Sequence, residues 1–399
     1  MKPFHRSALP AACAMAAVIS GGQAMAADTS IASSGTAFNP AIGVILGGTY
    51  SVYRHNPDDY VLSGFPLVED ALPVQQGLSL GETELSFSAN IDDQFYGAAV
   101  ISIDREGAVD VEEAYIQTLS LPEGFTTKAG RFFSGIGYLN SVHAHAWDFV
   151  DQPLVYRAML ANQLGDDGVQ LRWVAPTPLL VEFGGEVLRG DAYPGANGAH
   201  KGVGTKTAFI NFGGDVGVSN SWRAGISYVN AAAVDRESGD PAAPDMFTGS
   251  SRLGIFNAVW KWAPLGNPTD RNFKAQFEYF QRHEDGAFTT GDGSVTDAAY
   301  KGDQSGWYVQ AVYQFMPKWR IGLRYDALRA DATAAGLEDT ALDRAGHDPS
   351  RTSAMVDFSN SEFSRIRLQY NRDESGPQTD DQWYLQYVMS IGAHGAHQF

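Results

Sequence analysis

Cysteine and long hydrophobic runs are both scarce in this chain. The only cysteine among the 399 residues is Cys13, close to the N-terminus. Beyond it, no segment reaches the ~18 uninterrupted apolar residues that a membrane-spanning helix requires. Disulfides, thiolate metal sites and a helical membrane anchor are therefore excluded from the rest of the chain.

Basic residues are also in short supply. The chain has 28 Lys and Arg against 46 Asp and Glu, and its formal charge is −18 at pH 7. A polyanion is repelled by such a protein, so nucleic acid is not expected as a partner.

The N-terminus has the features of a secretory signal. Lys2 and Arg6 precede a short apolar run, Ala8–Ile19, and Ala24-Met25-Ala26 offers small residues to a signal peptidase. Residues 1–26 are therefore predicted to be a signal peptide. Residues 27–40 would be a periplasmic lead, and 41–399 a single domain.

The C-terminal segment alternates with a period of two. Trp383, Leu385, Tyr387, Met389 and Ile391 lie on one side of an extended chain, with polar residues mostly between them, and the chain ends on Phe399. This is the pattern of a strand with one apolar face. It resembles the terminal strand by which the bacterial barrel-assembly machinery recognises outer-membrane barrels, with Phe399 as the recognition residue.

The same alternation recurs along the whole chain, and short turns alternate with long polar connections. This asymmetry predicts an all-β, transmembrane, antiparallel up-and-down barrel of about sixteen strands, since an even number leaves both termini on one side. The predicted strands are 42–52, 85–91, 95–103, 109–119, 125–133, 168–174, 179–188, 206–212, 222–230, 253–262, 273–282, 307–315, 319–327, 353–358, 363–371 and 382–391.

The two faces of these strands differ in chemistry. Aromatic residues recur near strand ends, as in the interfacial girdles of membrane barrels. The opposite faces carry too many charges for a dry core, because an unpaired buried charge is costly. A soluble sandwich or propeller is the alternative, but the charges favour a wet interior; they are Arg172, Arg223, Lys261, Lys274, Glu278, Arg320, Arg324, Arg365 and Arg367.

One connection, Gly135 to Asp166, is long enough to have a function of its own. We expect it to fold into the lumen and narrow it, so that charges on the loop and the facing wall set selectivity. The alternative is that it covers the outside of the barrel or packs on a neighbouring subunit. The predicted constriction residues are Asp148, Asp151 and Arg157 on the loop and Glu113, Arg131 and Arg172 on the wall.

Several motifs resemble those of a known family. The run Lys128–Phe133 is followed by Asn140, Trp147, Phe149, Pro153 and the run Asp166–Leu171, and together they resemble the phosphate-selective porin O/P superfamily. The resemblance implies a sixteen-stranded outer-membrane channel, usually a homotrimer. The nearest group is a set of porin-like proteins labelled zinc-regulated outer-membrane receptors, which the ending Gly392–His397 also resembles.

The long loop departs from the O/P pattern. It offers Arg157 alone against Asp148, Asp151, Asp166 and Asp167, whereas the phosphate channels concentrate basic residues at the constriction. Phosphate selectivity is therefore not carried over, and a mild cation preference is expected.

The loop also contains His143-Ala144-His145. In an extended segment the two imidazoles would lie on one side and form half of a zinc site, with Asp148 or Asp151 as a third ligand. The alternative is that these are ordinary solvated histidines. Zinc binding would be transient, no permanent cofactor is expected, and none of the histidines is predicted to lie within a strand.

The sequence thus predicts an outer-membrane porin of a Gram-negative bacterium. It would pass small hydrophilic solutes or ions passively, with cations or a divalent metal such as zinc favoured, and it would not be an enzyme. Its partners would be these solutes, outer-membrane lipid, the barrel-assembly machinery and two further copies of itself. The alternatives are a barrel-embedded hydrolase and a non-conducting adhesin or structural protein.

Overall fold

The computed structural model describes residues 40–81, 83–103, 107–197, 202–333 and 335–392. The predicted signal peptide, all but the last residue of the predicted lead, and Phe399 lie outside the described residues.

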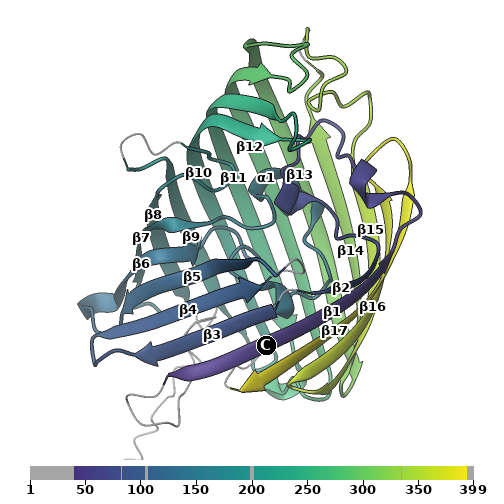
Figure 1. Cartoon of the computed structure of the whole chain (residues 1–399). Helices are drawn as coiled ribbons and strands as arrows, with labels where there is room; N and C mark the ends of the chain where they lie inside the picture. Colours follow the sequence, from purple (N-terminus) through teal and green to yellow (C-terminus); the bar gives the residue numbers. More distant parts are fainter. Residues whose placement is uncertain (1–39, 82, 104–106, 198–201, 334, 393–399) are drawn as a thin grey trace, which may run out of the picture.

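The chain forms a closed antiparallel β-barrel, as predicted (Figure 1). Each strand pairs with its neighbours along the chain, and β1 pairs with β17 from Gly43↔Gly392 to Val52↔Trp383. The sixteen strands of the ring are β1 (Ala41–Val52), β3 (Thr83–Asn90), β4 (Phe95–Ile103), β5 (Val109–Thr118), β6 (Phe125–Phe133), β7 (Gly165–Val174), β8 (Leu180–Leu188), β9 (Thr205–Val216), β10 (Asn220–Ser238), β11 (Asp245–Trp262), β12 (Asn272–Thr289), β13 (Ala298–Met316), β14 (Trp319–Ala330), β15 (Ser350–Ser361), β16 (Ser364–Glu374) and β17 (Asp380–Gly392).

One further strand, β2 (Gly77–Leu80), was not predicted. It pairs with Gly48–Ser51 of β1, while β3 pairs with the earlier residues Ala41–Ile45 of β1. The two segments therefore share one edge of β1, and β2 extends β3 after a break. Four residues are too few for the alternating pattern to be recognised.

In the described residues, helical structure is limited to short segments. The α-helix α1 (Leu154–Leu160) lies inside the barrel (Figure 1). Within the described part of the chain, no helix is both long enough and apolar enough to cross a membrane. The 3₁₀ turns are η2 (Pro57–Asp59), η3 (Glu69–Ala71), η4 (Pro122–Gly124), η5 (Ala144–Ala146) and η6 (Pro264–Gly266).

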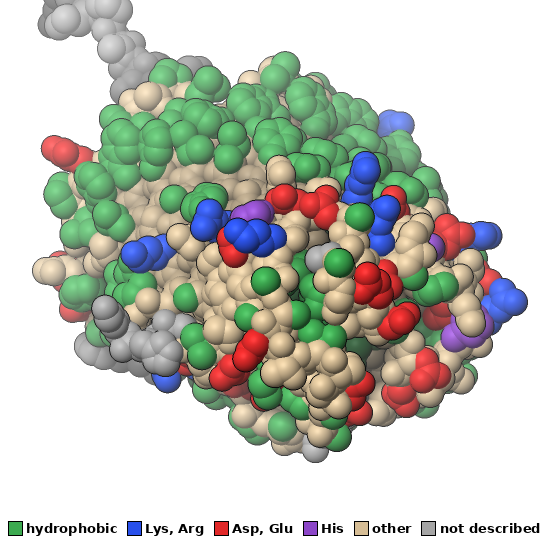
Figure 2. Space-filling view, turned by 90° about the horizontal axis from the view of Figure 1, so that it is seen from above, with side chains coloured by type: hydrophobic (Ala, Val, Ile, Leu, Met, Phe, Trp, Pro, Cys, Tyr) green, Lys and Arg blue, Asp and Glu red, His purple; other side chains and the backbone are tan. Residues whose placement is uncertain are grey.

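The outward face of the strands is apolar, in agreement with the alternation. Strand β14 exposes Ile321 and Leu323 and buries Arg324, and β17 exposes Trp383 and Leu385 and buries Gln382. Seen from the loop end, hydrophobic side chains form a band along the outer wall, whereas acidic side chains are spread among the loops (Figure 2). An exposed apolar surface of this extent needs lipid or another protein to cover it.

Strands β10 to β13 are longer than predicted. The strand β12 continues to Thr289, so His283 lies within it, and the prediction that no histidine falls within a strand was wrong. These extensions are rich in small and polar residues, which weakens the alternating signal. They are stabilised by a separate apolar cluster with the β14–β15 connection, made by Ala233, Phe247, Phe288, Tyr300, Leu337 and Leu342.

The apolar outer face gives a first testable prediction. Leu323 is 65% exposed near the middle of β14, and Leu265 is 85% exposed in η6, outside the strands. For a barrel in lipid, Leu323→Arg should lower the free energy of unfolding by about 2–4 kcal/mol, the cost of an arginine at the bilayer midplane. Urea unfolding of the protein in lipid vesicles measures this. Leu265→Arg is the control, and an equal effect of both changes would contradict a lipid-covered face.

Candidate functional site in the barrel lumen

The connection between β6 and β7, residues 134–164, folds into the barrel as predicted. All seven residues of α1 are buried. They pack with the wall and with residues of the β1–β2 connection in one continuous cluster, which includes Leu62, Phe65, Ile136, Leu139, Leu154, Tyr156, Leu160, Phe280, Tyr308 and Leu328. We call residues 134–164 the inward loop.

The inward loop is bound to one side of the lumen by two aspartates. Asp148 forms ion pairs with Lys274 of β12 and with Arg320 of β14, the latter at 3.3 Å. Asp151 lies 2.7 Å from Arg324 Nη2 of β14 and 2.7 Å from Arg351 Nη1 of β15. Each loop carboxylate therefore contacts two cations. We call this side, β12 and β14 to β16, the basic wall.

Backbone atoms of the inward loop strengthen this contact. Arg365 and Arg367 of β16 donate hydrogen bonds to the carbonyl oxygens of His145 and Trp147, at 2.5 and 2.7 Å. The carboxylate of Asp151 also accepts from the side-chain amides of Gln369 and Asn371, at 2.8 and 3.1 Å. The loop thus satisfies donors of the basic wall along several consecutive residues.

Burial and charge act in opposite directions on the two aspartates. Burial by itself would raise the pKa of Asp148. Lys274 and Arg320 lower this pKa by more than burial raises it, so it lies below the usual carboxyl range. Burial likewise raises the pKa of Asp151, and Arg351 and Arg324 outweigh it. Both carboxylates are therefore ionised at neutral pH, and both are neutralised by their partners.

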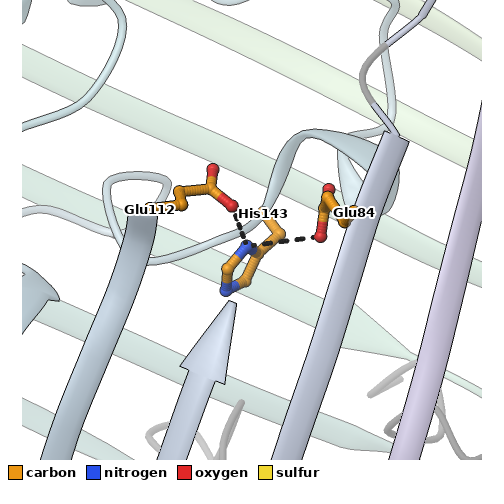
Figure 3. Close-up of side chains that lie close together, drawn as sticks. All are labelled: Glu84, Glu112 and His143. Atoms are coloured by element: carbon orange, nitrogen blue, oxygen red, sulfur yellow. Dashed lines mark hydrogen bonds and ion pairs between the residues drawn. The ribbon is translucent and has the colours of Figure 1, made fainter. Parts of the chain in front are cut away.

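The opposite side of the lumen, β3 and β5, presents glutamates to the two histidines of the loop. His143 Nδ1 lies 3.3 Å from Glu112 Oε2, and its Nε2 lies 3.1 Å from Glu113 Oε2. His145 Nδ1 lies 2.8 Å from Glu84 Oε1. Figure 3 shows Glu84 and Glu112 approaching His143 from two different strands. We call this side the acidic wall.

The electrostatics of His143 follow from this arrangement. Burial lowers its pKa, but the hydrogen bonds to Glu112 and Glu113 and the charge of Glu84 outweigh burial and raise the pKa well above its ordinary value. An imidazolium can donate from both ring nitrogens, as the two glutamate contacts require.

A third set of contacts joins the loop to the middle of the wall through Glu278 of β12. The hydroxyls of Tyr156 and Tyr308 donate to Glu278 Oε2, at 2.8 and 2.6 Å, and the backbone N–H of Tyr138 donates to Oε1 at 2.6 Å. Glu278 was predicted only as one of many wall charges. The alternating pattern does not distinguish it from the other wall charges, because its partners lie far away along the chain.

The predicted constriction residues do not form one ring. Asp148 and Asp151 meet the basic wall, and Glu113 lies on the acidic wall. Arg172 lies 3.7 Å from Glu182 of β8. Arg157 is buried in α1 with its guanidinium carbon 5.6 Å from the ring centre of Tyr60, in the β1–β2 connection.

Arg131 lies on the outer face of β6. Its Nε is 2.8 Å from Asp167 Oδ1, and the side chain is 41% exposed. The register places Arg131 opposite Ala114, an exposed residue of β5, while its neighbour Phe132 is buried. The structure thus places Arg131 away from the lumen residues with which it was grouped.

Two expectations about the lumen need correction. Asp148 and Asp151 do not lie beside the two imidazoles: the carboxylates that meet His143 and His145 are Glu84, Glu112 and Glu113. The faces expected to be wet are also largely covered, because Glu278, Arg324 and Arg367 are at most 2% exposed. The inward loop supplies a hydrogen-bond or ion-pair partner to each of the three, so these side chains have polar contacts without bulk water.

Comparisons with known proteins agree with this architecture. No family model matches the chain. Among solved structures, OmpT of Vibrio cholerae in a trimer form superposes with a TM-score of 0.53 and 10% identity, over 88% of this chain and 99% of that one. An anion-selective porin from Comamonas acidovorans gives a TM-score of 0.53 with 6% identity, over 88% and 99% of the two chains. At such identities the likeness shows the fold alone.

A closed sixteen-strand barrel with a loop folded into its lumen defines the porin-like class of β-barrels. A sequence relative is also known. An uncharacterized protein of Aquifex aeolicus (strain VF5) is 32% identical over 343 residues, which cover 82% of this chain and 71% of that protein. The chain belongs to the same family as that protein.

The paired aspartates give a second prediction. Asp151→Asn removes the loop carboxylate from the buried Arg324 and Arg351 and leaves them to share Asp326 of the wall. Removing one partner of a buried ion pair costs up to about 3–5 kcal/mol. We expect a loss of that order in the free energy of unfolding, measured by denaturant titration. The control is Asp348→Asn, which removes an exposed ion pair with Arg344 and should cost ~0–1 kcal/mol. Similar losses from both variants would show that Asp151 does not anchor the loop.

Proposed function

We propose that the protein is an outer-membrane channel through which small hydrophilic solutes or ions diffuse passively. The observation that supports this most directly is the inversion of polarity: apolar side chains cover the outside of the barrel, and charged side chains line the inside. A barrel with this distribution suits a lipid surround and a polar path. The inward loop then narrows the path.

The proposed selectivity follows from the charges that remain accessible. Asp148 and Asp151, which motivated the expected cation preference, are neutralised by the basic wall. Near the short connections, five lumen-facing cations are half-buried, whereas Glu182 and Asp357 are each 1% exposed. A solute entering from this end meets positive charge, so we propose an anion preference. The half-buried cations, here called the basic arc, are Arg172, Lys261, Lys274, Arg320 and Arg365.

Further parts of the proposal concern family and assembly. Membership of the phosphate-selective porin O/P superfamily is supported by the runs Lys128–Phe133 and Asp166–Leu171. A homotrimer is supported by the trimer form of the Vibrio cholerae neighbour, although the shared feature is the fold alone. Location in a bacterial outer membrane is supported by the apolar band and by the fold.

A second candidate is a sealed barrel that acts as an adhesin or a structural protein. The filling of the lumen by the inward loop and by Leu62 and Phe65 favours it, because these side chains are at most 3% exposed. A barrel-embedded hydrolase is less well supported. Both ring nitrogens of His143 face carboxylates, so its imidazole is not arranged to activate a hydroxyl.

Single-channel recording in planar bilayers tests the channel directly. The wild-type protein should conduct weakly because the inward loop occupies the lumen. The double variant Asp148→Asn with Asp151→Asn removes both loop carboxylates from the basic wall and should raise conductance severalfold. If both proteins were silent, the sealed barrel would be favoured. Circular dichroism and heat-modified gel mobility should first show that the double variant is a folded barrel.

The basic arc gives a separate prediction about selectivity. Lys261→Glu reverses one accessible charge in the lumen, so the reversal potential in a salt gradient should move toward cation preference. Lys301→Glu is the matched control, because Lys301 is 72% exposed and pairs with Asp285 on an outer face. The shift should shrink at high salt, since the Debye length falls from about 10 Å at 0.1 M to about 3 Å at 1 M. Wild-type cation selectivity would contradict the proposed anion preference.

A further inference from the structure

The acidic wall holds a cluster of buried and half-buried ligand groups that the channel function does not require. Glu84 of β3, Glu112 of β5 and His143 of the inward loop each offer one ligand atom, and these three atoms lie within 4.8 Å of one another. We propose that they bind a divalent first-row transition metal ion. This inference concerns binding at the loop–wall contact and does not depend on whether the barrel conducts.

The spacing of the ligand atoms fits a tetrahedral centre. His143 Nδ1 is 3.3 Å from Glu112 Oε2 and 3.6 Å from Glu84 Oε2. With metal–ligand distances of about 2.0–2.2 Å, the corners of a tetrahedral zinc site lie roughly 3.3–3.6 Å apart. Both distances from His143 Nδ1 match this spacing. The oxygens of Glu84 and Glu112 lie within 4.8 Å of each other and would approach one another around a metal ion.

Two neighbouring groups hold the ligands in a suitable orientation. Glu113 Oε2 lies 3.1 Å from His143 Nε2, so it can accept that N–H while a metal ion displaces the proton from Nδ1. His145 Nδ1 lies 2.8 Å from Glu84 Oε1, the oxygen that does not face His143. A carboxylate behind a ligating imidazole, and a donor behind a ligating carboxylate, are the usual outer contacts of metal sites.

Strand β5 has a β-bulge at this point. In the pairing of β4 with β5, Val100 faces Glu113 and Ile101 faces Val111, so Glu112 is an inserted, bulged residue. In a regular strand, adjacent side chains point to opposite faces. The bulge instead lets Glu112 and Glu113 both reach His143, and such bulges commonly re-aim a side chain at a functional site.

The charge balance also favours a cation. Glu84 and Glu113 are 3% and 4% exposed, and with Glu112 they place three carboxylates around two imidazoles. Buried carboxylates are costly unless paired, and a divalent ion would supply the missing positive charge.

The donor set indicates the class of metal. One imidazole with two carboxylates suits zinc and its first-row neighbours, whereas calcium and magnesium prefer oxygen ligands alone. Three protein ligands leave a fourth position for water or a solute. Because two ligands belong to the wall and one to the loop, bound metal would fix the inward loop against the acidic wall.

Zinc binding to the chelator-treated, detergent-solubilised full-length protein tests this inference. Competition with a chromophoric chelator should show one tight zinc ion per chain in the wild type. His143→Ala should abolish that binding, and Glu112→Gln should weaken it strongly. His145→Ala removes an outer contact and should weaken binding by about 10–100-fold. His283→Ala is the control, because His283 pairs with Asp303 on the outer face and should leave affinity unchanged.

Cobalt(II) absorption supplies a second measurement on the same proteins. Tetrahedral Co²⁺ should give an intense visible band in the wild type and the His283→Ala variant, and the band should be lost in His143→Ala. Circular dichroism verifies that each variant is folded, and Glu112→Gln serves if His143→Ala does not fold. Absence of tight binding to the wild type, or binding indifferent to both His143 and Glu112, would overturn the site. Conductance is recorded separately, so loss of the metal site and failure of the channel are distinguishable.

Discussion

The structure depends on how buried charge is paired inside a closed barrel. Closing the sheet removes its edges, but it also places every inward side chain in one confined space. Charges there are tolerated only if water or an opposite charge reaches them. The inward loop supplies the opposite charges. It places Asp148 and Asp151 against the arginines of β14 and β15, and it places His143 against the glutamates of β5. The loop is therefore part of the lumen's charge balance.

The order of charges along the loop matches the order of the walls. The histidines come first and meet the acidic wall, and the aspartates follow a few residues later and meet the basic wall. Between them, the carbonyl oxygen of Trp147 accepts a hydrogen bond from Arg367. Moving the loop along its own axis would bring like charges together on both sides at once. This explains why a segment with only one short α-helix has a defined position, and why the wall arginines can be buried without bulk water.

The sequence predicted the parts of this arrangement that depend on local pattern. Alternation of apolar and polar residues gave the strands, and the interruption between β6 and β7 gave the inward loop. Partners far apart in the chain were out of reach: His145 and Glu84 are 61 residues apart, and Arg351 and Asp151 are 200 apart. The bulge at Glu112 breaks the alternation from which a face is assigned. Arg131 was assigned to the lumen, although its register with Ala114 and Asp167 turns it outward.

The two walls differ in how completely their charges are matched. At the basic wall, Asp148 and Asp151 each contact two cations. Two of these cations, Arg320 and Arg324, also pair with the wall carboxylates Asp357 and Asp326. At the acidic wall, three carboxylates surround two imidazoles, and both imidazoles belong to the inward loop. The surplus of one sign on each side has opposite consequences. In the proposed channel, the cations left accessible near the short connections would act on a passing solute, whereas the carboxylates beside His143 would bind the proposed metal ion. A bound metal ion would balance the excess negative charge of the acidic wall. An anion in transit would balance the excess positive charge of the basic wall.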